Sequence, residues 1–293
     1  MTRPGVRRAR AGRPGRGGRR ADAAGWTKLT RSELRAAQTE ILSAFADFCA
    51  TNQLRYFLYA GTLLGSVRHE GYIPWDDDID VVMPRRDYDR LHLIASQQQA
   101  INGFSLCSPM TAPGFPFPFA KVADNKGTLS VEDDDVDYRI GINIDVFPLD
   151  GWPARILSRW VHDKSLSLLR ALMYLHHMTP EFTRADLRES LLALAKPVAK
   201  LISLDWLIRR ASSRASRYPA DESTHVGVVV WGYPERAGAQ AYSGADELCF
   251  EKRRYRVPSG YEAVLTAKYG NYMRLPPPEL RVPPHAIEAF RLG

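Results

Sequence analysis

The chain has 293 residues, of which 45% are hydrophobic and 25% charged, and it shows no internal repeat. This length and composition allow one substantial core, or a catalytic core with a helical appendage, and exclude a repeat architecture. A net charge of +7 would suit a nucleic-acid binder, but residues 1–25 alone hold eight Arg and one Asp. The remainder is close to neutral, so we expect no specific nucleic-acid partner.

Residues 1–25 are predicted to form a disordered basic tail, because Gly, Pro, Ala and Arg offer too little apolar surface to fold. The tail lacks the apolar stretch of a secretory signal, and we therefore expect a cytoplasmic protein. By charge alone the tail could touch anionic lipid or nucleic acid. Peripheral contact with the inner face of the membrane is left open.

A catalytic core is predicted for residues 26–151, and it begins with a helix. Thr30 and Glu33 form a capping box ahead of an apolar face. The residues of that face are Leu34, Ile41, Leu42, Phe45, Phe48 and Cys49. A strand from Tyr56 to Tyr59 is expected next.

A Gly-Ser pair, Gly65 and Ser66, follows that strand and is interpreted as a phosphate-binding turn. Gly65 would let the backbone approach closely, and Ser66 would open a helix whose first amide groups cradle a phosphate. Arg68 would then lie within reach for a bidentate phosphate contact. The alternative for Arg68 is a solvated helix face.

Asp78 and Asp80 alternate with Ile79 and Val81 in a pattern typical of a buried strand. Both carboxylates would then project from one side, about 7 Å apart, while the aliphatic residues enter the core. A carboxylate at the end of a buried strand needs a partner, and carboxylate oxygens suit Mg²⁺ or Mn²⁺. The alternative is that the three consecutive Asp residues form a solvated turn. Beside a metal, Asp76 and Asp77 are expected to shape the turn or to support the metal ligands.

A second strand, from Ile142 to Phe147, carries Asp145 on the face opposite its aliphatic residues. If it lies beside the first strand, Asp145 completes a three-carboxylate site, either as a metal ligand or as the base that deprotonates an attacking hydroxyl. An exposed edge-strand position is the alternative. Lys121 lies in an apolar, aromatic stretch, where its ammonium needs a phosphate or carboxylate partner.

Other elements fill a small mixed sheet with packed helices. The pattern predicts a helix over Arg86 to Gln98 and strands over Phe104 to Cys107, Phe117 to Val122 and Thr128 to Val131. The acidic run from Glu132 to Asp137 lacks the glycine of a calcium loop and is interpreted as a solvated loop.

Residues 152–218 are predicted to be a helical insertion, with helices around Arg155 to Met178 and Leu187 to Ile208. A core helix is favoured for the second, with a membrane-surface or acceptor-binding helix as the alternative. Residues 219–293 are predicted to complete the core, with a strand from Val226 to Trp231 and a helix from Tyr261 to Tyr269.

The segment from Tyr59 to Pro84 resembles the motif of the LicD family, which is related to the fukutin group within the nucleotidyltransferase-fold superfamily. Similarity continues in Lys121, Val122 and Asp124 before Thr128, in Ile144 to Gly151, and in Tyr269 to Met273 followed by Leu275, Pro276 and Pro277. The resemblance spans most of residues 30 to 285 and implies an α/β, mixed α+β fold of the nucleotidyltransferase type.

The resemblance also implies a reaction. A phospho-alcohol group would pass from a CDP-activated donor, CDP-choline in bacterial relatives or CDP-ribitol in eukaryotic ones, to a hydroxyl of a cell-surface glycan or teichoic-acid-like acceptor, with release of CMP. Asp78 and Asp80 match the metal-binding pair of the family, Gly65 and Ser66 the phosphate-binding turn, and Asp145 the third acidic position. The donor alcohol, phosphocholine or a polyol phosphate, is left open.

Two other functions remain compatible with the sequence. One is a nucleotidyltransferase that moves NMP from a nucleoside triphosphate onto a protein, a sugar or a small molecule and releases pyrophosphate. The other is an inactive sugar-phosphate binding module that keeps the fold.

Overall fold

The structure, a computed structural model, describes residues 25–131, 138–177, 196–197, 199–232 and 236–293. Residues 1–24 of the predicted tail and the whole acidic run from Glu132 to Asp137 lie outside the described residues. So does the greater part of the segment that precedes Leu204, within which a helix from Leu187 is predicted.

A mixed sheet built around the long strand β7 (Ile142–Gly151) forms the centre of the molecule. Its order is β2-β3-β7-β5-β4, with β2 at Phe57–Leu58, β3 at Asp80–Pro84, β5 at Ala120–Asp124 and β4 at Ser105–Cys107. Strand β3 runs parallel to β7, and the other pairs in this order are antiparallel. The predicted mixed α/β class is therefore confirmed.

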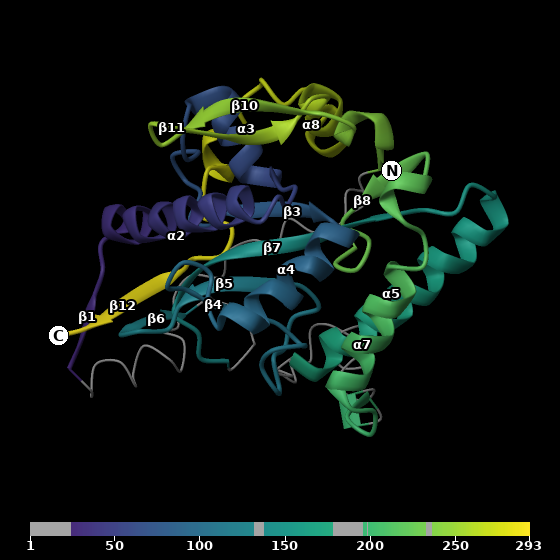
Figure 1. Cartoon of the computed structure of the whole chain (residues 1–293), viewed down its shortest axis with the longest axis horizontal. Helices are drawn as coiled ribbons and strands as arrows, with labels where there is room; N and C mark the ends of the chain where they lie inside the picture. Colours follow the sequence, from purple (N-terminus) through teal and green to yellow (C-terminus); the bar gives the residue numbers. More distant parts are fainter. Residues whose placement is uncertain (1–24, 132–137, 178–195, 198, 233–235) are drawn as a thin grey trace.

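Two helices pack on this sheet and bury its faces (Figure 1). Helix α2 (Arg31–Thr51) lies along β7 and β5, and α4 (Arg85–Gln98) lies against β3 and β7. The predicted capping box is confirmed, because the Thr30 hydroxyl accepts from the backbone N–H of Glu33 and the Glu33 carboxylate accepts from that of Thr30. The expected apolar face of α2 is buried.

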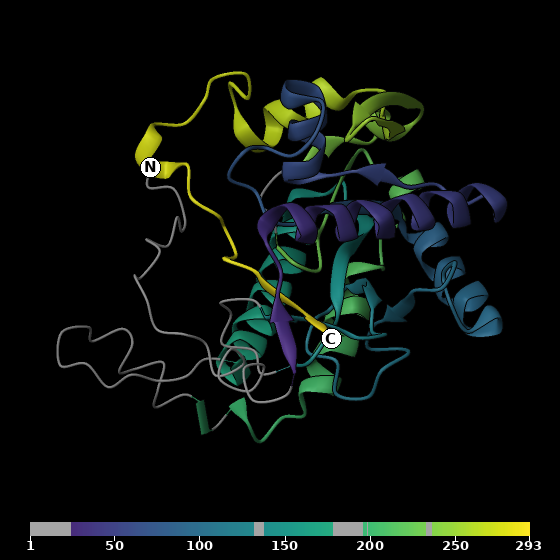
Figure 2. The same cartoon turned by 90° about the vertical axis from the view of Figure 1, so that its left-hand side faces the viewer.

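A second layer covers one end of the sheet (Figure 1). It contains α3 (Ala60–His69), the hairpin β10 (Ala245–Phe250) and β11 (Arg253–Pro258), and α8 (Tyr261–Tyr269). From α8 the chain runs back across the molecule to β12 (Glu288–Leu292), which pairs with β1 (Trp26–Lys28) and β6 (Thr128–Val131) (Figure 2). Short 3₁₀ helices lie at η1 (Ala220–Glu222), η2 (Ala239–Tyr242) and η3 (Pro278–Leu280).

Helices α5 (Ile156–His177) and α7 (Leu204–Ala215) lie beside the sheet with a buried cluster of their own (Figure 1). Its buried members are Trp152, Leu166, Met173, Leu207, Ile208, Ala211, Ala215, Val229 and Val230. No helix in the described ranges combines the length and the hydrophobicity needed to cross a bilayer. The domain boundaries proposed from the sequence remain predictions.

Two predicted elements are wrong in extent. The strand predicted from Val226 to Trp231 is β8 (His225–Gly227) alone, which pairs with β7 and with β9 (Ala237–Gly238). The apolar run extends beyond this strand. Val228 packs in the main core, and Val229 and Val230 pack in the cluster with α5 and α7, although the chain turns there. The predicted helix ending at Ile208 is also interrupted, because residues 200–203 form a turn and bend before α7 begins.

Candidate active site

Strands β3 and β7 bring two predicted acidic residues together. In this parallel pair Asp80 stands opposite Asp145 in the register, and the backbone N–H of Asp145 donates to the carbonyl oxygen of Ile79 at 2.9 Å. The expectation that the two strands lie side by side is therefore confirmed. The side chain of Asp80 is buried, whereas that of Asp145 is partly open to solvent.

One small cavity gathers residues from six parts of the chain: α2, the loop before β3, β5, β6, β7 and the segment before β12. Of the predicted site residues, Asp78, Asp145 and Lys121 line it, and Asp80 stands beside Asp145. The full lining consists of Gln38, Asp78, Ile79, Lys121, Ser130, Asn143, Asp145, His285 and Ile287.

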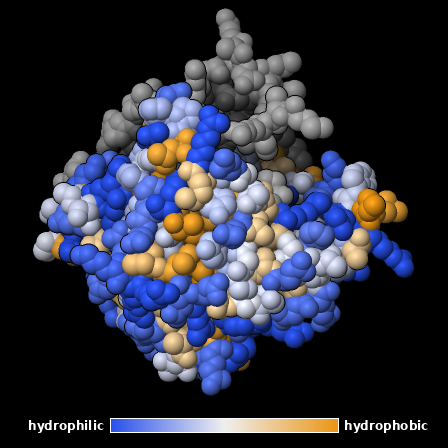
Figure 3. Space-filling model, turned by 90° about the horizontal axis from the view of Figure 1, so that it is seen from above, coloured by the Kyte–Doolittle hydropathy of each residue, from blue (hydrophilic) through white to orange (hydrophobic). Residues whose placement is uncertain are grey.

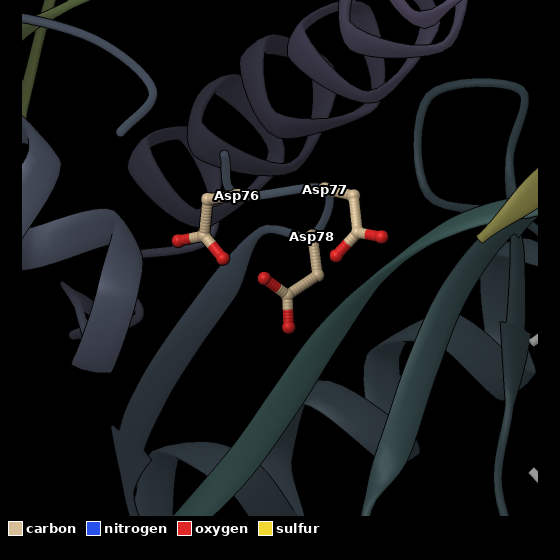
Figure 4. A group of neighbouring side chains, drawn as sticks. All are labelled: Asp76, Asp77 and Asp78. Atoms are coloured by element: carbon tan, nitrogen blue, oxygen red, sulfur yellow. The ribbon is translucent and has the colours of Figure 1, made fainter. Parts of the chain in front are cut away.

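The loop before β3 carries three consecutive carboxylates toward one side (Figure 4). Ligand oxygens of Asp76, Asp77 and Asp78 all lie within 4.8 Å of one another, which is close enough to share one metal ion. Asp80 and Asp145 lie outside this group. Asp76 and Asp77, expected to shape the turn or to support the ligands, thus bring their own carboxylate oxygens beside those of Asp78.

The electrostatics of the site reflect this crowding of like charges. Burial, followed by the negative charges of Asp78 and Asp145, raises the pKa of Asp80 well above its usual range. Burial and the neighbouring Asp78 raise the pKa of Asp76 to about 8. Burial also acts on Asp78, but its hydrogen bonds with His285 and Asp76 outweigh burial and lower its pKa.

Lys121 of β5 provides a positive charge within the acidic cluster. Its ammonium lies 2.7 Å from Oδ1 of Asp145 and donates to Oδ1 of Asn143 at 3.2 Å. The same ammonium lies 4.9 Å from the ring centre of Phe117 and 5.8 Å from that of Phe119, and both rings are buried. The carboxylate partner expected for this buried lysine is Asp145.

The donor set fits a hard divalent cation. Asp78, Asp80 and Asp145 offer only carboxylate oxygens, and Asp76 and Asp77 add more within the same loop. Oδ1 of Asp77 is buried and has no hydrogen-bond partner among the described residues. Because burial and mutual repulsion raise the pKa of Asp76 and Asp80, a cation with oxygen preference would relieve the main strain in this cluster.

The expectation that Ser66 opens a helix is wrong. Gly65 and Ser66 lie in the middle of α3, so their amide groups bond within the helix. A Cβ on Gly65 would lie 2.3 Å from the carbonyl oxygen of Gly71, and the Ser66 hydroxyl donates to the carbonyl oxygen of Cys249 at 2.8 Å. The Gly-Ser pair therefore packs α3 against its neighbours and does not form a turn.

Arg68 also lies away from the carboxylates. It belongs to the last turn of α3, where Nη1 donates to the carbonyl oxygen of Tyr272 at 2.9 Å. Burial lowers its pKa, with a smaller opposing effect from Tyr269. Arg68 therefore anchors the segment after α8 and does not lie on a fully solvated helix face, while its phosphate contact stays a prediction.

The end of α3 that faces the acidic cluster is its N-terminus. Thr62 accepts from the backbone N–H of Asp80 at 2.8 Å, and a Cβ on Gly61 would lie 2.3 Å from Oδ2 of Asp76. Ala60, the first helical residue, has a positive φ of 46°. Glycine at 61 thus lets the Asp76 carboxylate lie against the helix, and a larger side chain there would displace that carboxylate.

Three residues at the site escape the sequence patterns. His285 bonds to Asp78 at 3.2 Å, and the backbone N–H of Ile287 donates to Asp77 at 3.0 Å. Both come from the segment before β12, and no spacing links them to residues 200 positions earlier. For Gln38 the sequence does contain an indication of its role, because it is a polar residue on the otherwise apolar, buried face of α2.

Two comparisons show which known proteins this chain is similar to. The family model for the LicD/FKTN/FKRP nucleotidyltransferase domain matches residues 53–148, which include β3, β5 and most of β7. The chain is also 26% identical over 269 residues to the lipopolysaccharide cholinephosphotransferase LicD of Haemophilus influenzae, covering 90% of this chain and 99% of that protein.

The resemblance to the LicD family is therefore confirmed, and residues 53–148 are the part of the chain that matches the family's nucleotidyltransferase domain. A shorter match of 51 residues, 46% identical, links the chain to the uncharacterized protein RP689 of Rickettsia prowazekii. It covers 17% of this chain and 19% of that protein.

Proposed function

We propose that this protein is a phosphotransferase that moves phosphocholine, or a similar phospho-alcohol, from a CDP-activated donor to a hydroxyl of a cell-surface glycan. The proposal is supported by the likeness to the Haemophilus influenzae LicD protein over nearly the whole of both chains. It rests above all on one observation, the in-register pairing of Asp80 with Asp145 beside the Asp78 loop.

In the proposed reaction the acceptor oxygen attacks the phosphorus that bears the alcohol. A new P–O bond forms to the glycan, the bridging P–O bond to the nucleotide breaks, and CMP leaves with the bridging oxygen. Asp145 takes the proton of the attacking hydroxyl. Lys121, 2.7 Å from Oδ1 of Asp145, holds that carboxylate in place against the repulsion of Asp80.

Asp78, Asp80 and Asp145 are the residues we expect to hold Mg²⁺ or Mn²⁺, with Asp76 and Asp77 alongside. When bound, the ion supplies neutralising charge for the phosphate oxygens. The N-terminus of α3, beside Asp76 and Asp80, faces the same region with its positive dipole end. It takes over the phosphate-binding role that the sequence assigned to Gly65 and Ser66.

The test is turnover of CDP-choline and CDP-ribitol with a glycan acceptor, with Mg²⁺, Mn²⁺ or chelator present. We expect CMP and a phospho-alcohol adduct, and we expect Asp80→Asn and Asp145→Asn to lower kcat by about a hundredfold or more. Asp89→Asn is the matched control, because Asp89 is a carboxylate on α4 with a 59% exposed side chain. Full activity in Asp78→Ala or Asp80→Ala protein would defeat the proposal.

The same assay separates the other two functions. NMP transfer is the second candidate, because the matched family model describes a nucleotidyltransferase domain. Pyrophosphate release from a nucleoside triphosphate, without CMP release from a CDP-alcohol, would identify it. Binding of a donor without turnover would indicate an inactive binding module.

A further inference from the structure

The outer side of α5 exposes an unusual concentration of large apolar side chains. Five of them fall within thirteen residues and are between 45% and 83% exposed: Ile156, Leu157, Trp160, Val161 and Leu168. Leu93 on α4 and Met110 are also exposed, but each stands singly, as is normal for a protein surface. With Lys164, these five residues define the α5 outer face.

The spacing shows that this face is a helical stripe. Leu157, Val161, Lys164 and Leu168 recur at intervals of four, three and four residues, which places them on one side of the helix. The opposite side is buried, where Leu166 and Met173 pack in the cluster shared with α7. Helix α5 is thus apolar on two sides, and only one of them has a partner in the described parts of the chain.

The charges around the stripe are positive. Arg155 and Lys164 are exposed and Arg159 is half-exposed. The one acidic residue of α5, Asp163, accepts from the indole N–H of Trp152 and pairs with Arg236. A Trp and aliphatic residues bordered by cations, without an unpaired acid, match the interface of a membrane that contains anionic lipid.

The position of the face suits such contact. Figure 1 places the beginning of α5 at the edge of the molecule, well away from the sheet, and Figure 3 shows hydrophobic residues at that same edge beside strongly hydrophilic ones. The helix follows directly after β7, whose residues from Asp145 to Gly151 span about 20 Å. Contact through α5 would hold the cavity near a membrane without burying it.

We propose that the α5 outer face binds the surface of a membrane rich in anionic lipid, with Leu157 and Trp160 inserted between head groups. The readout is lipid binding, so the proposal does not depend on the transferase activity.

The test is flotation of the full chain with vesicles of phosphatidylcholine containing 30% phosphatidylglycerol, compared with vesicles of phosphatidylcholine alone. We expect binding to the anionic vesicles, and a loss of about tenfold or more in affinity for the double variant Leu157→Gln, Trp160→Gln. Leu93→Gln is the control, because Leu93 is equally exposed on α4. Unchanged melting temperatures would show that all variants fold.

The basic residues 1–24 would bind anionic vesicles by charge alone. The test therefore depends on the difference in vesicle binding between the variants and the unaltered chain. Binding through those residues is abolished by high salt and is equal in all variants. Equal binding of the double variant and the unaltered chain would overturn the proposal. A concentration-dependent dimer that the double variant loses, with no difference in lipid binding, would instead assign the face to a second copy of the chain.

Discussion

Arg85 and Asp150 form a buried ion pair next to the C-terminal ends of β3 and β7. Nε of Arg85 donates to Oδ1 of Asp150 at 2.8 Å and Nη2 donates to Oδ2 at 2.6 Å, and Asp150 is inaccessible to solvent. A bidentate pair of this kind contributes little net stability as a whole, but removing one partner leaves the other buried without compensation.

Replacement of Asp150 by Ala should therefore destabilise the protein by about 3–5 kcal/mol. Asp221→Ala is the matched control, because Asp221 pairs with Arg55 and Arg86 on the surface and should cost about 1 kcal/mol or less. Denaturant unfolding of both variants measures the difference. If the two costs are equal, the buried pair is not the anchor that its geometry indicates.

The residues of the site differ in how far the sequence reveals them. Alternation of polar and apolar residues predicts the strand that carries Asp145, and burial of an ammonium predicts a partner for Lys121. Both inferences need only local pattern and the cost of burying charge. The place of His285 in the site, by contrast, depends on a long-range contact with Asp78 that no local pattern predicts. Its neighbours Pro283 and Pro284 indicate an irregular segment but not which part of the molecule that segment crosses.

Helix α3 shows where pattern analysis fails at the level of an element. A Gly-Ser pair is typical of turns, but here Gly65 is a helix residue selected by the close approach of the carbonyl oxygen of Gly71. Hydrophobic period predicts the buried face of α2 correctly, whereas it makes the strand at β8 too long. Close packing between two backbone segments produces no periodic pattern in a sequence. The helical position of Gly65 could therefore not be predicted without the fold.

Gly65→Ala should therefore destabilise the protein, although Ala favours a helix interior by about 1 kcal/mol. The added methyl would meet the Gly71 oxygen at 2.3 Å, and overpacking of this kind costs about 1–3 kcal/mol. Gly238→Ala is the control, because its nearest neighbours would lie 3.8 Å away. An unchanged unfolding midpoint with a raised KM for the donor would restore the phosphate-binding interpretation.

Helix α5 contains a buried histidine, His162, that makes the stability of the protein depend on pH. His162 is inaccessible to solvent, lies 5.2 Å from the ring of Tyr218, and has no hydrogen-bond partner for either ring nitrogen among the described residues. Burial, followed by the charge of Arg214, lowers its pKa below the ordinary value near 6.5. The folded protein thus holds His162 neutral where the unfolded chain would protonate it.

The stability that depends on neutral His162 is fully present above about pH 6.5 and is lost as the pH falls toward its lowered pKa. We expect the free energy of unfolding to decrease between about pH 7.5 and 5.5, and to decrease less in His162→Leu protein. His92, also buried with a lowered pKa, keeps part of the dependence in this variant. The half-exposed His225→Leu serves as control, and an identical slope in all three proteins would contradict the assignment.

The acidic site is assembled from the whole length of the molecule. It draws on α2, the loop before β3, β5, β7 and the segment before β12, so its carboxylates come together only when the chain is folded. A cation that binds this cluster binds the folded state and not the unfolded chain. Metal binding must then appear as added stability of the whole protein.

Mg²⁺ or Mn²⁺ at about 100 times its Kd should stabilise the protein by about 2.7 kcal/mol, which raises the melting temperature by about 5 °C or more. Asp80→Asn should lose this rise. Its melting temperature in chelator should not fall, because the change removes one charge from a cluster in which repulsion already raises the pKa of Asp80. Asp89→Asn should respond like the unaltered chain.

The two outcomes for Asp80→Asn protein locate the ion. If its melting temperature still rises with metal, the ion binds elsewhere. If the rise is lost and the stability in chelator is unchanged, the ion binds among the carboxylates of β3 and β7.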